Sequence, residues 1–164
     1  LGMGLIPSMG MAENVMLRSF ERTGSFFLDK KTAVQDSARM VKELDIATPD
    51  LLTPVSRLSG GNVQKGLLER EIQDHPQLLI AAYPVRGLDI HSSYTIYRLL
   101  NEQKEKGVAV IYVGEDLDVL LELCDRILVL CGGKVSGIVD GRTITKEEVG
   151  FLMTTHKGEG RGHD

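Results

Sequence analysis

The sequence predicts an α/β fold with a mostly parallel sheet, a helical first part and a C-terminal β-hairpin. Two continuous apolar runs of strand length, Leu78–Ala82 and Val108–Val113, have the composition of buried parallel strands. Helical patterns precede and separate them, and this alternation is typical of α/β layers. A third apolar run, Arg126–Cys131, is followed by Gly132 and Gly133 and then by KVSGIVDG, which predicts a hairpin with a two-residue turn.

Composition indicates an ordinary globular chain of 164 residues, 42% of them hydrophobic and 26% charged. The net charge is −4 and only 5% of the residues are aromatic, so neither a basic nucleic-acid face nor a base-stacking platform is expected. Cys124 and Cys131 lack neighbouring His or Cys residues, which predicts two small buried thiols and no metal site. No apolar run is long enough to cross a membrane. The chain opens without an initiator Met or a basic leader, as expected of a fragment cut from a longer protein.

Two helices are expected in the first part of the chain. The segment Met11–Phe20 has helical spacing of apolar residues, with Glu13 in its first turn. A second helix is expected over about Thr32–Leu44. Its apolar face would hold Val34, Ala38, Val41 and Leu44, which follow helical spacing. Pro49 and Pro54 break the chain after it.

Three further helices follow from their start signals. Ser59 is a good N-cap for a helix that lasts until about residue 74, where Pro76 follows. Another helix is expected over about His91–Lys106, and a short one over Asp116–Leu123.

The last helix is predicted from a capping box formed by Thr145 and Glu148, and it extends to about Met153. The polar, Gly-rich end of the chain is expected to be disordered. These patterns suggest a helical lead-in over residues 1–57, an α/β core over 58–157 and a disordered tail over 158–164.

The segment Leu58–Lys65, LSGGNVQK, carries the clearest chemistry. Ser59, Gly60 and Gly61 at a helix start leave several backbone N–H groups unpaired and unshielded. The helix dipole adds partial positive charge there, so the position suits a phosphate. By itself the same pattern often forms only a cap in a tight turn, so both interpretations stay open at this point.

Four motifs in order resemble those of the ATP-binding cassette (ABC) ATPases of membrane transporters. They are LSGGNVQK, LLIAAYP, RGLD and VGED, and the resemblance covers the chain up to about Met153. Asn62 stands where Gln is commoner in the family signature, a form similar to that of the tandem-cassette importers of sugars and nucleosides. The resemblance implies a partial P-loop NTPase domain, the C-terminal part of a second cassette.

In that family two cassettes pack head to tail, and each ATP lies between the phosphate loop of one cassette and the signature of the other. The resemblance therefore implies that Ser59, Gly60, Gly61 and Asn62 contact an ATP held by a partner cassette. It also implies that Asp89, in RGLD, communicates across the dimer. The alternative for Asp89 is an N-cap-like turn residue before the helix from His91.

The chain departs from the family pattern at three places, and the second and third predict that this cassette's own site is inactive, whereas a late start of the chain explains the first. The chain holds no Gly-x-x-x-x-Gly-Lys-Ser/Thr phosphate loop. Ala82 and Tyr83 stand where the family carries an Asp for magnesium and a Glu for the attacking water, and a Tyr is a poor general base near neutral pH. Glu115 stands at the family's switch histidine, where a carboxylate would repel a phosphate.

The resemblance implies a fragment of the energy-coupling subunit of an importer, working with ATP and Mg²⁺ in the full assembly. The implied partners are another cassette, in the same longer chain or in a homodimer, and transmembrane permease subunits. The implied location is cytoplasmic, at the inner face of the cell membrane. A non-catalytic scaffold or regulatory module, and a soluble cassette protein of translation or DNA repair, are the alternatives. The isolated chain is expected neither to hydrolyse ATP nor to bind it tightly.

Overall fold

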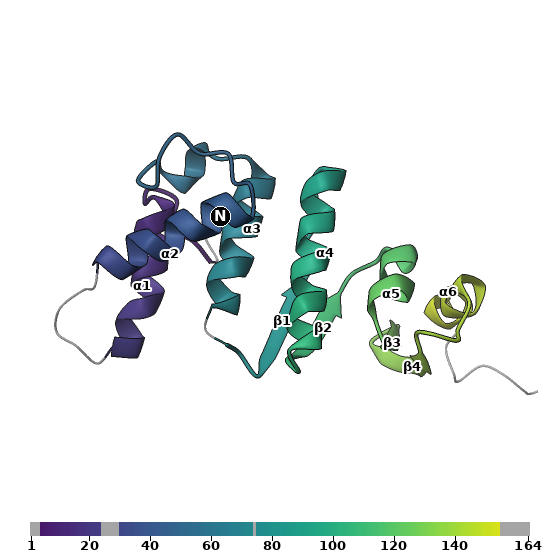
Figure 1. Cartoon of the computed structure of the whole chain (residues 1–164). Coiled ribbons are helices and arrows are strands. Elements are labelled where there is room, and N and C mark those ends of the chain that lie inside the picture. Colours follow the sequence, from purple (N-terminus) through teal and green to yellow (C-terminus); the bar gives the residue numbers. More distant parts are fainter. Residues whose placement is uncertain (1–3, 24–29, 74, 155–164) are drawn as a thin grey trace, which may run out of the picture. The chain divides into compact units, whose positions relative to one another are not determined.

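The computed structural model describes residues 4–23, 30–73 and 75–154, which form two compact units of mixed α and β structure (Figure 1). Of the described residues, those from 4 to 79 and from 84 to 111 belong to the first unit, and those from 80 to 83 and from 112 to 154 belong to the second. The expected tail over residues 158–164 lies outside the described residues.

The elements follow the predicted order. Those before residue 80 are α1 (Met11–Thr23), α2 (Lys30–Glu43), the short 3₁₀ helix η1 (Val55–Arg57), α3 (Gly60–Ile72) and the start of β1 (Leu78–Ala82). Those after it are α4 (Ile90–Glu105), β2 (Ala109–Val113), α5 (Leu117–Leu123), β3 (Arg126–Cys131), β4 (Lys134–Asp140) and α6 (Lys146–Thr154). Each predicted helix and strand is present, with bounds shifted by at most a few residues. Among the described residues no helix is long and apolar enough to cross a membrane.

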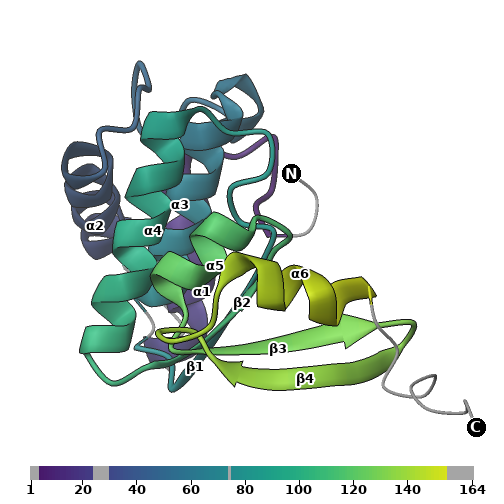
Figure 2. The same cartoon turned by 90° about the vertical axis from the view of Figure 1, so that its right-hand side faces the viewer.

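Helices form the first unit, in which α1 packs on α2 and α3 packs on α4 (Figures 1 and 2). Met11 of α1 is 2% exposed and lies against Gly66 of α3, where a Cβ would collide with the methionine side chain. Ile96 of α4 and Met40 of α2 are also fully buried. The small residue at position 66 therefore lets α1 approach α3 closely.

The predicted buried face of α2 is wrong by one position at Val34, Ala38 and Val41, whereas Leu44, just after the helix, is buried as predicted. Ala33, Ser37 and Met40 are the buried residues of α2, whereas Val34 is 45% exposed. Both sets of residues satisfy helical spacing, so periodicity alone does not choose between them. The small Ala33 and Ser37 permit close packing, and the buried Ser37 hydroxyl donates to the carbonyl oxygen of Ala33 at 2.7 Å.

Strands β1 and β2 form a two-stranded parallel sheet. The amide of Ala109 donates to the carbonyl of Gln77 at 3.0 Å, and the amide of Tyr83 donates to that of Val113 at 2.8 Å, so the paired positions advance together. The prediction that these strands are buried throughout is wrong, because burial alternates and Ile80 is 62% exposed. In the described residues only one face of this sheet is packed.

The second unit is built on the predicted hairpin of β3 and β4, which forms a separate two-stranded antiparallel sheet (Figure 2). Ile127 and Val129 point to the same face of β3 and pack with Val149 of α6. Residues of α5 complete this small core. Cys124 and Cys131 form no disulfide and are only half-buried, so the prediction that both thiols are buried is wrong. Cys124 follows α5 and packs against the edge of this core, and Cys131 ends β3.

Candidate functional site

The start of α3 combines a side-chain cap with backbone amides that are unpaired within the described part of the chain. Ser59 is extended and caps the helix, its Oγ accepting from the amide of Asn62 at 3.4 Å, as predicted. Ser59 and Gly60 are exposed. Within the described part of the chain, no acceptor lies at hydrogen-bond distance from the amides of Gly60 and Gly61. These donors, together with the helix dipole, fit a phosphate group.

The two glycines of this helix start have different surroundings. A Cβ on Gly60 would have one neighbour within 4 Å, a methyl group of Leu88 at 3.7 Å. A Cβ on Gly61 would collide with the hydroxyl oxygen and Cβ of Ser92 on α4. Gly60 thus leaves the amides uncovered, whereas Gly61 lets the beginnings of α3 and α4 pack against each other.

Asp89 is the N-cap of α4, so the N-cap interpretation of this residue is confirmed as geometry. Its Oδ1 accepts from the amide of Ser92 at 2.9 Å, and its Oδ2 accepts from the Ser92 hydroxyl at 2.7 Å. Both bonds lower the pKa of the Asp89 carboxyl below its ordinary value, and the bond from the backbone amide has the larger effect. Because Ser92 also borders Gly61, one serine connects the carboxylate with the start of α3.

Two side chains of α3 bind the segment that leaves α2. Nδ2 of Asn62 donates to the carbonyl oxygen of Ala47 at 3.3 Å. Nζ of Lys65 donates to the carbonyl oxygens of Leu44 at 3.1 Å and Asp45 at 3.3 Å. Lys65 is only 3% exposed. No role for Lys65 is predicted from the sequence, although its position three residues after Asn62 puts both on one side of the helix.

The expected degenerate positions lie at the ends of strands. Ala82 is the last residue of β1 and is exposed. Tyr83 follows it with φ 50°, a left-handed conformation that is rare for an aromatic residue, and its side chain is 46% exposed. Glu115 is exposed and immediately precedes Asp116, the N-cap of α5.

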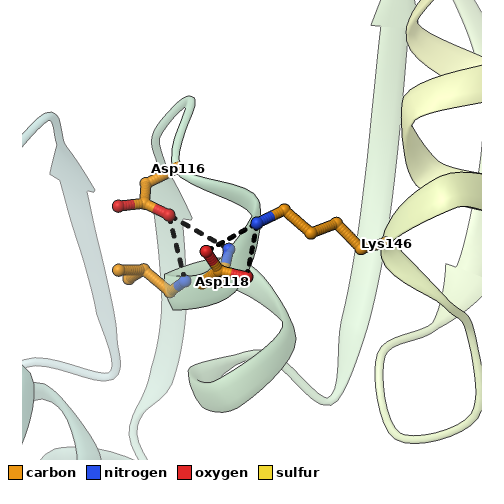
Figure 3. Close-up of polar contacts among 4 residues, drawn as sticks. Asp116, Asp118 and Lys146 are labelled. Atoms are coloured by element: carbon orange, nitrogen blue, oxygen red, sulfur yellow. Dashed lines mark hydrogen bonds and ion pairs between the residues drawn. The ribbon is translucent and has the colours of Figure 1, made fainter.

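The start of α5 is held by polar contacts within the second unit (Figure 3). Oδ1 of Asp116 accepts from the amides of Asp118 at 3.0 Å and Val119 at 3.4 Å. Nζ of Lys146, at the start of α6, donates to both carboxylate oxygens of Asp118, at 2.7 and 2.6 Å. This contact raises the pKa of Lys146. The segment that follows Glu115 is thereby tied to α6.

The donor groups fit a phosphate better than they fit a metal ion. Among the described residues, no group of three or more His, Cys, Asp or Glu side chains could hold a metal. The end of β1 offers a methyl group and a phenol at Ala82 and Tyr83, neither of which is an anionic oxygen ligand of the kind Mg²⁺ prefers.

Comparisons with known proteins identify relatives along nearly the whole chain. The xylose import ATP-binding protein XylG of Moorella thermoacetica is 35% identical over 94% of this chain. The guanosine import ATP-binding protein NupO of Bacillus subtilis is 34% identical over 98% of it. The chain spans only 31% and 32% of the lengths of these two relatives. No protein-family model matches the chain.

Solved structures show the same fold. A dimeric ATP-binding cassette bound to ADP and Pi has a TM-score of 0.71 with this chain at 24% identity, over 85% of this chain and 60% of the other. An inward-facing ABC transporter of the metal-chelate type has a TM-score of 0.73 at 18% identity, over 89% of this chain and 58% of the other. The architecture is therefore that of part of an ABC ATPase.

Proposed function

Because the chain is related to the ATP-binding subunits of ABC importers for sugars and nucleosides, we propose that it is part of such a subunit. It would be the C-terminal part of the second cassette in a tandem-cassette protein. The observation that carries this proposal is the start of α3. Ser59 and Gly60 are exposed there, and the amides of Gly60 and Gly61 have no acceptor among the described residues.

The proposed task of this helix start is to complete an ATP site on a partner cassette. The hydroxyl hydrogen of Ser59 is available to donate, because its oxygen accepts from the amide of Asn62. The amides of Gly60 and Gly61 supply two further donors. Together they would bind the terminal phosphate, stabilising the charge that develops there during hydrolysis. Asp89 would hold the neighbouring turn in place at the contact with the partner.

The cassette's own hydrolytic site is proposed to be inactive. Ala82 offers no ligand atom for Mg²⁺, and the Tyr83 phenol is a poor base near neutral pH. Glu115 would place a negative charge where a donor to a phosphate is needed. ATP and Mg²⁺ would thus act at the site where the partner supplies the phosphate loop.

The proposed partners are a second cassette, in the same longer chain or in a homodimer, and transmembrane permease subunits. The corresponding location is cytoplasmic, at the inner face of the membrane. The comparison structures include a dimeric cassette and a transporter, which supports this assignment.

The test is Ser59→Arg in the full-length protein assembled with its partners. A bulky cation at the helix start would cover the amides, so we expect ATP turnover to fall by about 100-fold or more. Ser56→Arg, three residues earlier at another exposed serine, is the matched control and should retain activity. Wild-type turnover in Ser59→Arg would contradict the proposal.

The second candidate function is a scaffold that neither binds nor hydrolyses ATP. Ala82 and Tyr83 at the end of β1 favour it, because they lack the carboxylates that hydrolysis needs. Association measured with and without ATP distinguishes the two. A signature donor should associate with its partner cassette more tightly in ATP, whereas a scaffold should associate equally in both conditions. Calorimetry of the 164-residue chain alone should detect no tight ATP binding.

A further inference from the structure

The ammonium group of Lys65 is buried without a carboxylate among its hydrogen-bond partners. Its two acceptors are the carbonyl oxygens of Leu44 and Asp45, which are 21 and 20 residues away in sequence. Burial of a charged group is unfavourable unless hydrogen bonds replace its water. Lys65 is 3% exposed, so its ammonium group depends on these two carbonyl oxygens for hydrogen bonds.

The two carbonyls follow the C-terminal end of α2, where they receive no backbone hydrogen bond from the described residues. The amide of Leu44 donates the last helical hydrogen bond, to the carbonyl oxygen of Met40. The amide of Ile46 donates to the carbonyl oxygen of Val41 at 2.9 Å. Asp45 between them has φ 48°, in the left-handed conformation that commonly ends a helix. Lys65 supplies the donors for this end, and its positive charge also complements the helix dipole.

A second contact lies one turn earlier on α3. Asn62 donates to the carbonyl of Ala47, so Asn62 and Lys65 bind one short segment, residues 44–47, from the same side of the helix. We call these contacts the α2–α3 clamp. Asn62 is also the residue whose amide is capped by Ser59. The clamp thus acts on the first two turns of α3, next to the unpaired amides of Gly60 and Gly61.

We propose that Lys65, together with Asn62, is a positioning residue that fixes the first turn of α3 relative to the end of α2. Loss of the clamp would then release the amides of Gly60 and Gly61 from their orientation and lower the affinity of that helix start for a phosphate. This inference rests on the proposed function as far as ATP is concerned. The clamp itself rests only on the contacts above.

The test compares three lysine variants in the full-length protein assembled with its partners. Lys65→Met removes the donors and keeps an unbranched stem, and Lys65→Arg keeps a cationic donor. Lys42→Met is the matched control. Lys42 lies in the last turn of α2, close in sequence to the carbonyls that Lys65 binds, but it is exposed. The measurements are kcat and KM for ATP, and hydrogen exchange of the amides of Ile46 and Val63.

We expect Lys65→Met to raise KM for ATP about tenfold with a smaller fall in kcat, and exchange at both amides to accelerate about tenfold. Lys65→Arg should recover most of both effects, and Lys42→Met should show neither. A variant that merely unfolded in part would lose kcat at constant KM.

Two results would overturn the proposal. One is unchanged exchange at Ile46 and Val63 in Lys65→Met. The other is an unchanged KM in Lys65→Met while Ser59→Arg abolishes turnover. If instead Ser59→Arg leaves turnover at the wild-type rate, the proposed function fails, and the exchange rates still decide whether the clamp exists.

Discussion

Gly61 of α3 lies so close to Ser92 of α4 that a Cβ on the glycine would collide with the serine side chain. Gly61 is buried, whereas its neighbour Gly60 is exposed. The second glycine of LSGGNVQK is therefore required by the packing of two helix starts, independently of any nucleotide. The first glycine has no such packing requirement, which leaves exposure of the amides as its structural consequence.

Gly61→Ala should destabilise the protein by about 1–3 kcal/mol, because the added methyl group overpacks the contact with Ser92. Urea denaturation of the full-length protein measures this. Gly60→Ala is the matched control and should stay within about 1 kcal/mol of the wild type, since its Cβ makes only an ordinary contact with Leu88. Combining Gly61→Ala with Ser92→Gly should show favourable coupling in a double-mutant cycle. Equal stabilities of the two alanine variants would contradict the packing assignment.

The Asp89 carboxyl should titrate below its ordinary pKa of 3.8, since the amide and hydroxyl of Ser92 bind its charged form. A folded-state pKa below the unfolded value means that these bonds stabilise the fold above pH 3.8. That contribution is lost as the pH falls through the folded-state pKa.

Carbon-detected NMR titration of the Asp89 carboxyl measures this pKa. Ser92→Ala keeps the amide and removes the hydroxyl, so it should raise the pKa part of the way back towards 3.8. An Asp89 pKa that is the same in wild type and Ser92→Ala would show that the hydroxyl bond is not formed in solution.

The ion pair of Lys146 with Asp118 should stabilise the start of α5 at low ionic strength. Its hydrogen bonds raise the pKa of Lys146 above 10.5, so the stabilisation is complete below that pH and is lost as the pH rises through the folded-state pKa. Lys146→Gln should lower the melting temperature slightly in dilute buffer, and the difference should disappear at 1 M salt, because both side chains are exposed. Lys134→Gln, at an exposed lysine of β4, is the control. A difference that persists at high salt would refute an electrostatic origin.

Tyr83→Phe should leave ATP turnover of the assembled protein within about twofold of the wild type, because a phenol is a poor general base at neutral pH. The ring is retained, and the side chain is already half-exposed, so little stability should be lost. Tyr94→Phe, at an exposed tyrosine of α4, controls for loss of a phenol hydroxyl elsewhere. A selective loss of turnover in Tyr83→Phe would assign chemistry to this site.

Much of the candidate site could be predicted from local sequence. The caps at Ser59, Asp89 and Thr145 form as expected, the last through bonds between Thr145 and Glu148 in both directions. Such bonds join residues two or three positions apart, so the pattern of residue types contains all the participants. The strand over Leu78–Ala82 and the hairpin were predictable for the same reason.

Contacts between distant parts of the chain were not predictable in this way. Helical spacing at 34, 38, 41 and 44 and at 33, 37, 40 and 44 is equally regular, and only the packing of α1 on α2 selects the second. Likewise, LSGGNVQK by itself does not tell that Gly61 meets Ser92 or that Lys65 binds the end of α2. The sequence by itself determined the elements, their caps and the exposed amides, since these depend on neighbours along the chain. Only the tertiary structure decided which faces are buried and what holds the first turn of α3, because the contacts of Asn62 and Lys65 join residues 15 to 21 positions apart.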